Sequence, residues 1–223
     1  MDFNIIRTNR KTMAIYVRND GSVEVRAPKR MDLHTIEQFV HSKTDWIKSK
    51  ITIARKTIEQ KQEHIITYGD DVRYLGEYYP IQGREGPYIG FQNEFYIPYG
   101  LLDDQVKQAV IQIYKLLAKQ VIQSKVKHYA QIMRVSPTSI RVNSAKTRWG
   151  SCSSKGGLNF SWRLVMAEES VVDYVVVHEL SHLLQMNHSK EFWRIVESIL
   201  PQFQEEKRKL KGLEKKLQQE VWE

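Results

Sequence analysis

The spacing of hydrophobic positions predicts three short strands at the start of the chain. Residues 3–6 and 14–18 are rich in side chains that favour strands, and residues 22–26 alternate between apolar and polar positions. The last two runs are joined by residues 19–21, which have the sequence Asn-Asp-Gly. Because Asp-Gly favours the tight turns that connect antiparallel strands, this segment predicts a β-hairpin.

A helix and a second group of strands are expected next. Asp32 can cap the helix, because its side chain can accept hydrogen bonds from the first free backbone N–H groups. Residues 65–98 are rich in Gly, Pro and Tyr, and strands are predicted at 74–79 and 94–97. We therefore expect residues 1–100 to form a small β-rich N-terminal portion with a helical insert. The apolar face of that helix would contain Ile36, Phe39, Val40, Trp46 and Ile47.

A long helix is predicted between about residues 103 and 133. Asp103 and Asp104 favour its start, because negative charge is stabilised at the N-terminus of a helix. Pro137 disfavours a helical conformation at the residue before it, and this predicts where the helix ends. The apolar positions that recur at helical spacing are Val106, Val110, Ile113, Leu117, Val121 and Tyr129.

Two strands and a buried helix complete the second half. Residues 140–143 and 158–164 have the pattern of strands, and the segment 147–157 between them is a predicted loop because it is rich in turn-forming residues. Residues 171–184 are largely apolar, as expected of a helix that is buried on all sides. We expect residues 101–223 to form a second domain with a charged C-terminal helix, and the whole chain to have an α+β fold.

The apolar helix contains the pattern H-E-x-x-H. Residues four positions apart lie on the same face of a helix, so His178 and His182 can bind one metal ion. Glu179 is placed to accept a proton from a water molecule on that ion. Burying two imidazoles and a carboxylate is costly unless a metal or hydrogen bonds compensate them. The alternative is a pair of hydrogen-bonded core histidines beside a solvated glutamate.

A catalytic zinc site needs a third protein ligand and leaves its fourth position to water. His188 is the first choice for this ligand, and Glu191 and Glu197 are its rivals. On an unbroken helix His188 would point away from the other two histidines, because six residues correspond to about 240° of rotation. The helix must therefore turn near residues 185–187, and Asn187 is expected to adopt the left-handed conformation that ends it.

Composition and charge narrow the function further. The chain has 223 residues, one cysteine and no apolar run long enough to span a membrane. Because the lone Cys152 excludes an internal disulfide and no signal sequence is evident, we expect a cytoplasmic protein without membrane association. The net charge of +8 allows contact with nucleic acid, but the charges are scattered and no DNA-binding motif is present. Nothing in the sequence indicates an oligomeric state.

Several segments together resemble those of a known family. Residues 148–152 (Arg-Trp-Gly-Ser-Cys), 173–182 and 187–193 look like the matching segments of the YgjP-like metallopeptidase family. This family is a bacterial group of predicted metal-dependent hydrolases related to the SprT and WLM zinc proteases. Similarity extends to residues 26–28 and 75–76, and so covers nearly the whole chain. The resemblance implies a minimal zincin-like core, in which a long helix, a small sheet and the H-E-x-x-H helix enclose one Zn²⁺ ion.

The resemblance also implies roles at the metal. His178, His182 and His188 would be the zinc ligands. Glu179 would be the general base that activates water to cleave a peptide or protein substrate. Two other functions remain open: hydrolysis of a nucleoside triphosphate by the same metal centre, and a DNA-associated protease or binding protein. No phosphate-binding glycine motif supports the first of these.

Substrate binding is expected next to the metal. In zincins the strand before the active-site helix commonly offers its edge to an extended peptide, and residues 158–164 would have this role here. Arg148, Trp149 and Asn159 are the expected substrate-binding residues. For Trp149 a structural role, filling space between sheet and helix, is slightly favoured because of its large apolar area.

Overall fold

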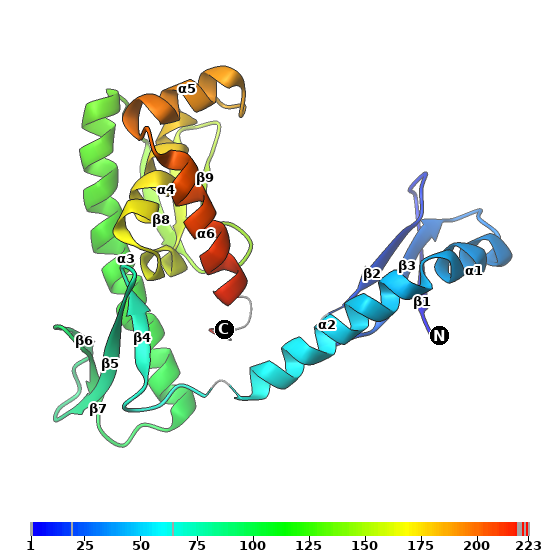
Figure 1. Cartoon of the computed structure of the whole chain (residues 1–223), viewed down its shortest axis with the longest axis horizontal. Coiled ribbons are helices and arrows are strands. Elements are labelled where there is room, and N and C mark those ends of the chain that lie inside the picture. The colour runs from blue at the N-terminus through cyan, green and yellow to red at the C-terminus, as the bar shows by residue number, and fades with distance from the viewer. Residues whose placement is uncertain (1, 19, 64, 218–219, 221, 223) are drawn as a thin grey trace. The chain divides into compact units, whose positions relative to one another are not determined.

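The computed structural model describes residues 2–18, 20–63, 65–217, 220 and 222, apart from the side chains of residues 55–63. The chain forms two compact units, made mainly of residues 1–64 and of residues 65–218 (Figure 1). This division differs from the expected one at residue 100, because the strands of residues 71–98 share a hydrophobic core with the long helix that follows them. No helix within the described segments combines the length and the apolar character needed to cross a membrane.

The first unit is a three-stranded sheet with two helices. Its elements are β1 (Asn4–Thr8), β2 (Ala14–Val17), β3 (Val23–Pro28), α1 (Leu33–Ser42) and α2 (Thr44–Glu63). The strand order is β1-β3-β2, with β1 parallel and β2 antiparallel to β3. The β2–β3 pair confirms the predicted hairpin, although Asn19 in its turn lies outside the described residues. Alternate side chains of β3, those of Val23, Val25 and Ala27, are buried in the core of this unit.

The predicted helix of the first unit begins where expected but is interrupted. The side chain of Asp32 accepts a hydrogen bond from the backbone N–H of Thr35 at 2.8 Å and caps α1. The apolar positions of the one predicted helix are divided between α1 and α2. Ile36 and Ile47 are fully buried, whereas Trp46 is 46% exposed and does not belong to the buried face.

The second unit begins with a four-stranded sheet of order β4-β5-β7-β6. Its strands are β4 (Asp71–Tyr74), β5 (Glu77–Arg84), β6 (Gly90–Phe91) and β7 (Phe95–Pro98). The predicted strand 74–79 is divided by a turn at Leu75 and Gly76, which have φ of 48° and 91°, so that Tyr74 ends β4 and residues 77–79 begin β5. The backbone N–H of Leu75 donates to the carbonyl oxygen of Val165 at 2.7 Å. This bond attaches the turn to the segment that precedes the H-E-x-x-H helix.

The long helix α3 (Asp103–Met133) has the predicted bounds. Its N-terminus is stabilised by the side chain of Gln105, which accepts a hydrogen bond from the backbone N–H of Leu102 at 2.9 Å. The helix ends where Arg134 adopts a left-handed conformation with φ of 54°, before Pro137 is reached. The predicted strand 140–143 follows as β8 (Ser139–Asn143).

The second sheet differs from the sequence prediction at two strands. β9 (Gly150–Cys152) lies within the expected loop 147–157, and β10 (Gly157–Ser161) ends early because residues 162–166 form a 3₁₀ helix. The strand order is β8-β10-β9, with β10 parallel to β8 and antiparallel to β9. Both edges of β10 are therefore occupied. The expected pairing of a peptide with strand 158–164 is wrong for this reason.

Three further helices complete the second unit and confirm the α+β fold. They are α4 (Glu169–Ser181), α5 (Lys190–Ile199) and α6 (Phe203–Leu217), and α6 carries the charged C-terminal segment. α4 contacts α3, α5 and α6, so helices enclose it on several sides (Figure 1). The fully buried Trp162 stacks on Tyr114 of α3 with ring centroids 5.4 Å apart. The core of the unit thus holds α4, the H-E-x-x-H helix, in place.

Replacing Gly76 by alanine is expected to destabilise the second unit more than replacing Gly69. Both glycines have a positive φ, so alanine strains either backbone by roughly 1–2 kcal/mol. Only at Gly76 would the new Cβ also lie 2.8 Å from Cγ and 3.1 Å from Cα of Glu168, the residue at the N-cap position of α4. Urea unfolding should therefore show the larger loss of free energy for Gly76→Ala. Equal losses would mean that the turn does not support the start of α4.

Candidate metal centre

Helix α4 carries one predicted ligand, His178, and the predicted base, and a second predicted ligand, His182, is the residue that caps its C-terminus. Because the helix is enclosed by its neighbours, side chains such as Val172 and Val176 are fully buried. Glu179 is only 6% exposed, so its carboxylate is buried with them. His178 and His182 lie on one side of the helix, with ring centroids 5.0 Å apart. The alternative of core histidines beside a solvated glutamate does not fit, since this glutamate is not solvated.

The chain turns earlier than predicted and brings His188 back to the other histidines. α4 ends at Ser181, and His182 is its capping residue with φ of −67° and ψ of −19°. Asn187 is not among the described residues with a positive φ, so the left-handed cap expected there is wrong. A tight hydrogen bond from the backbone N–H of Ser189 to the carbonyl oxygen of Asn187, at 2.7 Å, reverses the chain instead.

The three predicted ligands lie together. The ring centroid of His188 is 5.0 Å from that of His178 and 4.8 Å from that of His182. The Nε2 atoms of His178 and His188 are 3.0 Å apart, and one ring nitrogen of each histidine lies within 4.8 Å of the other two. Two nitrogens bound to one zinc ion are at most about 4.2 Å apart, so the group fits an ion after a slight inward movement. The rivals Glu191 and Glu197 are exposed and do not belong to this group.

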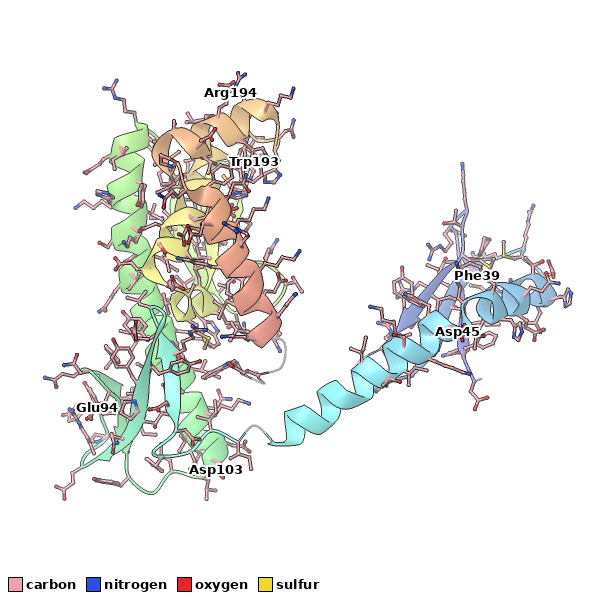
Figure 2. All side chains as sticks on the ribbon, in the orientation of Figure 1. Phe39, Asp45, Glu94, Asp103, Trp193 and Arg194 are labelled. Atoms are coloured by element: carbon pink, nitrogen blue, oxygen red, sulfur yellow. The ribbon has the colours of Figure 1, made fainter. Side chains whose placement is uncertain are left out.

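Aromatic side chains of α5 support the three imidazoles. The fully buried ring of Phe192 lies 4.6–4.9 Å from all three, measured between centroids. Trp193 stacks on His188 at 5.8 Å and on Phe203 of α6 at 5.4 Å. Figure 2 labels Trp193 between α5 and α6. These contacts fix the ring of His188, which lies beyond α4 and its capping residue His182.

One of the three imidazoles is oriented by a hydrogen bond, whereas two other buried polar atoms of the site have no hydrogen-bond partner among the described residues. Nδ1 of His182 lies 3.3 Å from the carbonyl oxygen of Gln185. With Nδ1–H as the donor, the lone pair of Nε2 is left for a metal ion. Nδ1 of His178 and Oε2 of Glu179 are buried and have no hydrogen-bond partner among the described residues. A cation between the imidazoles would compensate the burial of the carboxylate.

Burial sets the protonation of the two adjacent residues in the metal-free chain. Burial, followed by the nearby His182 and His188, lowers the pKa of His178 to about 3. This ring is therefore neutral at neutral pH, the form that binds a metal. Burial raises the pKa of Glu179 to about 7, against a smaller opposite effect of the Arg148 guanidinium. A carboxyl group with a pKa near the working pH is suited to accept and release a proton.

Gly150 of β9 lies directly against Glu179. A Cβ atom at this position would be 2.6 Å from both Cγ and Oε1 of the glutamate. Only glycine therefore allows the strand to approach the carboxylate so closely. Sequence reasoning missed this residue, because a single glycine in a turn-rich segment gives no local sign of a contact with a distant helix. Its one signal was its place in the family-like segment 148–152.

The residues predicted to bind substrate lie in different settings. Arg148 is exposed two residues before the start of β9, and its charge acts on Glu179. Trp149 is half-buried and packs against the main core, as its structural role requires. Asn159 lies in the middle strand β10, opposite Ser151 of β9. Contact of these three residues with a substrate stays a prediction.

Metal-dependent hydrolysis is the chemistry for which gathered imidazoles beside a buried carboxylate are suited. The model of the YgjP-like metallopeptidase domain family matches residues 11–213, and the chain belongs to this family, which confirms the resemblance found in its sequence. The chain is also similar to the metallopeptidase zymogen of Pyrococcus abyssi abylysin, at 25% sequence identity. This match covers 45% of the present chain and 98% of the other, with a TM-score of 0.39. No curated protein matches the chain.

In the metal-free protein, the free energy of unfolding of Glu179→Gln relative to that of the wild type is expected to increase as the pH rises from 4.5 to about 7. The folded chain holds a proton on Glu179 that the unfolded chain releases in this range, so the wild type loses stability with rising pH and the glutamine variant does not. Over the whole pH range, the free energy of unfolding of the variant relative to the wild type should change by about 3 kcal/mol. It can be measured by urea unfolding of chelator-treated proteins between about pH 5 and 8. A difference that does not change with pH would contradict the buried carboxyl group.

Proposed function

We propose that the protein is a zinc metallopeptidase in which His178, His182 and His188 hold one Zn²⁺ ion and Glu179 is the general base. The observation that carries this proposal is the convergence of three ring nitrogens within 4.8 Å beside a buried carboxylate. Three imidazole ligands suit zinc and leave one position for water or substrate. Membership of a metallopeptidase family supports a peptide or protein as the substrate.

The residues of the site have separate roles in this reaction. When bound, zinc would polarise the scissile carbonyl group and lower the pKa of water to about 7. Glu179 takes a proton from the attacking water and passes it to the leaving amine. The burial of Glu179 keeps its carboxylate free of bulk water, which makes it a stronger base. Arg148 would bind a substrate oxygen, and the effect of its charge on this carboxylate supports that role.

β9, rather than strand 158–164, is the strand we assign to peptide binding. Among the described residues β9 is an edge strand, with β10 on one side only. It also lies beside Glu179 through Gly150. An extended peptide paired with β9 would be held by backbone hydrogen bonds and would pass the carboxylate. Asn159 would then reach a peptide only through its side chain, because both backbone edges of β10 are occupied.

Glu179→Gln is expected to keep its zinc and to lose turnover by about a hundredfold or more, because an amide accepts no proton from water. His188→Ala should lose zinc as well as turnover. Glu191→Gln is the matched control: it makes the same chemical change at an exposed position outside the histidine group and should keep both. Zinc is measured by elemental analysis, and turnover by mass spectrometry of a peptide library.

Two results would reject the assignment. A wild-type protein without zinc after purification and zinc loading would remove the metal site, and full turnover by Glu179→Gln would remove the base. The library is run beside a set of nucleoside triphosphates. If only a nucleotide is hydrolysed and Glu179→Gln abolishes this, the metal centre acts on phosphoanhydrides and not on peptides.

Gly150→Ala is expected to lower kcat/KM at least about tenfold with unchanged zinc content, because the added Cβ forces β9 and Glu179 apart. Gly212→Ala in α6 is the control, since a Cβ there meets nothing within 4 Å. Full activity of Gly150→Ala would show that the contact between β9 and Glu179 is not needed for the reaction. Loss of zinc from this variant would mean that the contact supports the ligands instead.

A further inference from the structure

A basic groove runs along β8, which is the edge strand opposite β9 in the β8-β10-β9 sheet. Its first part, with a volume of about 540 Å³, lies between α3 and β8. Its second part, of about 570 Å³, lies at the C-terminal end of α3. Ile140 at the start of β8 lines both parts, so they adjoin. We call the two parts together the β8 groove.

The backbone edge of β8 forms one wall of this groove. Residues 140–144 all line its first part, one after another. Because successive side chains of a strand point to opposite faces, consecutive residues line one groove only where it faces the strand's edge. Within the described chain, β8 has a strand partner on one side alone, which is β10. Its other edge presents backbone N–H and C=O groups that can pair with an added strand.

The described residues that line the groove carry charge of one sign. Neither part has a carboxylate or an aromatic ring among its described lining residues. A concave surface lined by one sign of charge attracts ligands of the opposite sign. The cationic side chains that line it are Lys115, Lys119 and Arg141 in the first part, and Lys127 and Arg134 in the second.

We propose that the β8 groove binds an extended peptide segment with Asp or Glu at alternate positions, added as a strand to β8. Lys115 and Lys119 lie one helical turn apart on α3, a distance of about 6 Å along the axis. Side chains on one face of a strand repeat every ~6.6–6.8 Å. Carboxylates at alternate positions of the peptide therefore match the two lysines. β8 has 5 residues and sets the length of the bound segment to about 17 Å.

The lining favours a peptide over single-stranded nucleic acid. Proteins that bind single strands combine cations with aromatic side chains on which the bases stack. The β8 groove has the cations and, among its described lining residues, no aromatic ring. Since β10 separates β8 from β9 by about 10 Å in all, the bound segment is not the one that lies at Glu179. This binding does not depend on the proposed peptidase activity.

The test uses the full chain with Glu179→Gln, so that the probe stays intact, and a fluorescent peptide of alternating Glu and Val. We expect binding that weakens with added salt and protection of residues 139–143 from hydrogen exchange. Lys119→Glu combined with Arg141→Glu should weaken binding at least about tenfold. Lys211→Glu combined with Lys215→Glu on α6 makes the same change of charge at exposed positions and should have no effect.

Two further probes separate strand addition from simple charge attraction. Peptides that are N-methylated at odd or at even positions lose half of their backbone donors, and one of the two should bind at least about tenfold more weakly. Equal binding of both, or protection at 150–152 in place of 139–143, would overturn the proposal. The proposal would also be overturned if an oligo-dT probe bound more tightly than the acidic peptide and Lys119→Glu combined with Arg141→Glu abolished that binding. If that double variant unfolds, the wild-type exchange and the methylated peptides decide.

Discussion

The structure depends on one constraint: helix α4 must be apolar enough to pack among other helices and still carry an imidazole and a carboxylate in its interior. The rise of the Glu179 pKa to about 7 and the fall of the His178 pKa to about 3 both express the cost of this burial. A cation held by the imidazoles would offset this cost, because it favours the charged carboxylate. Metal binding at this site would therefore be coupled to the stability of α4.

The third imidazole needs support that α4 cannot give. His188 follows the helix and is held by Trp193, which stacks in turn on Phe203 of α6. Nζ of Lys207 on α6 also lies over the Trp193 ring, 4.7 Å from its centroid. The charged C-terminal helix is thus connected to the candidate metal centre through stacked rings. A change in the position of α6 would reach His188 by this route.

The sequence predicted those features that depend on local pattern. The bounds of α3 could be predicted from helical spacing and from its acidic start. The turn that brings His188 to the other histidines could also be predicted, because six residues on an unbroken helix would place it on another face. The left-handed cap predicted at Asn187 was wrong, because a tight backbone turn reverses the chain there without a residue of positive φ. The strand order β8-β10-β9 could not be predicted from local sequence pattern, since strand pairing depends on contacts between distant segments. The contact of Gly150 with Glu179 depends on that order.

The central position of β10 gives the small sheet two edges with different chemistry. β9 has a glycine beside the buried carboxylate of Glu179, whereas β8 faces a row of cations. Charged residues on an edge strand also protect it from aggregation, and this explains a residue such as Arg141 on β8 itself. It does not explain Lys115, Lys119 and Lys127, which lie on α3 across the groove. Cations on the opposite wall leave the edge open and act on whatever pairs with it, so their position favours recognition of a ligand over protection of the strand.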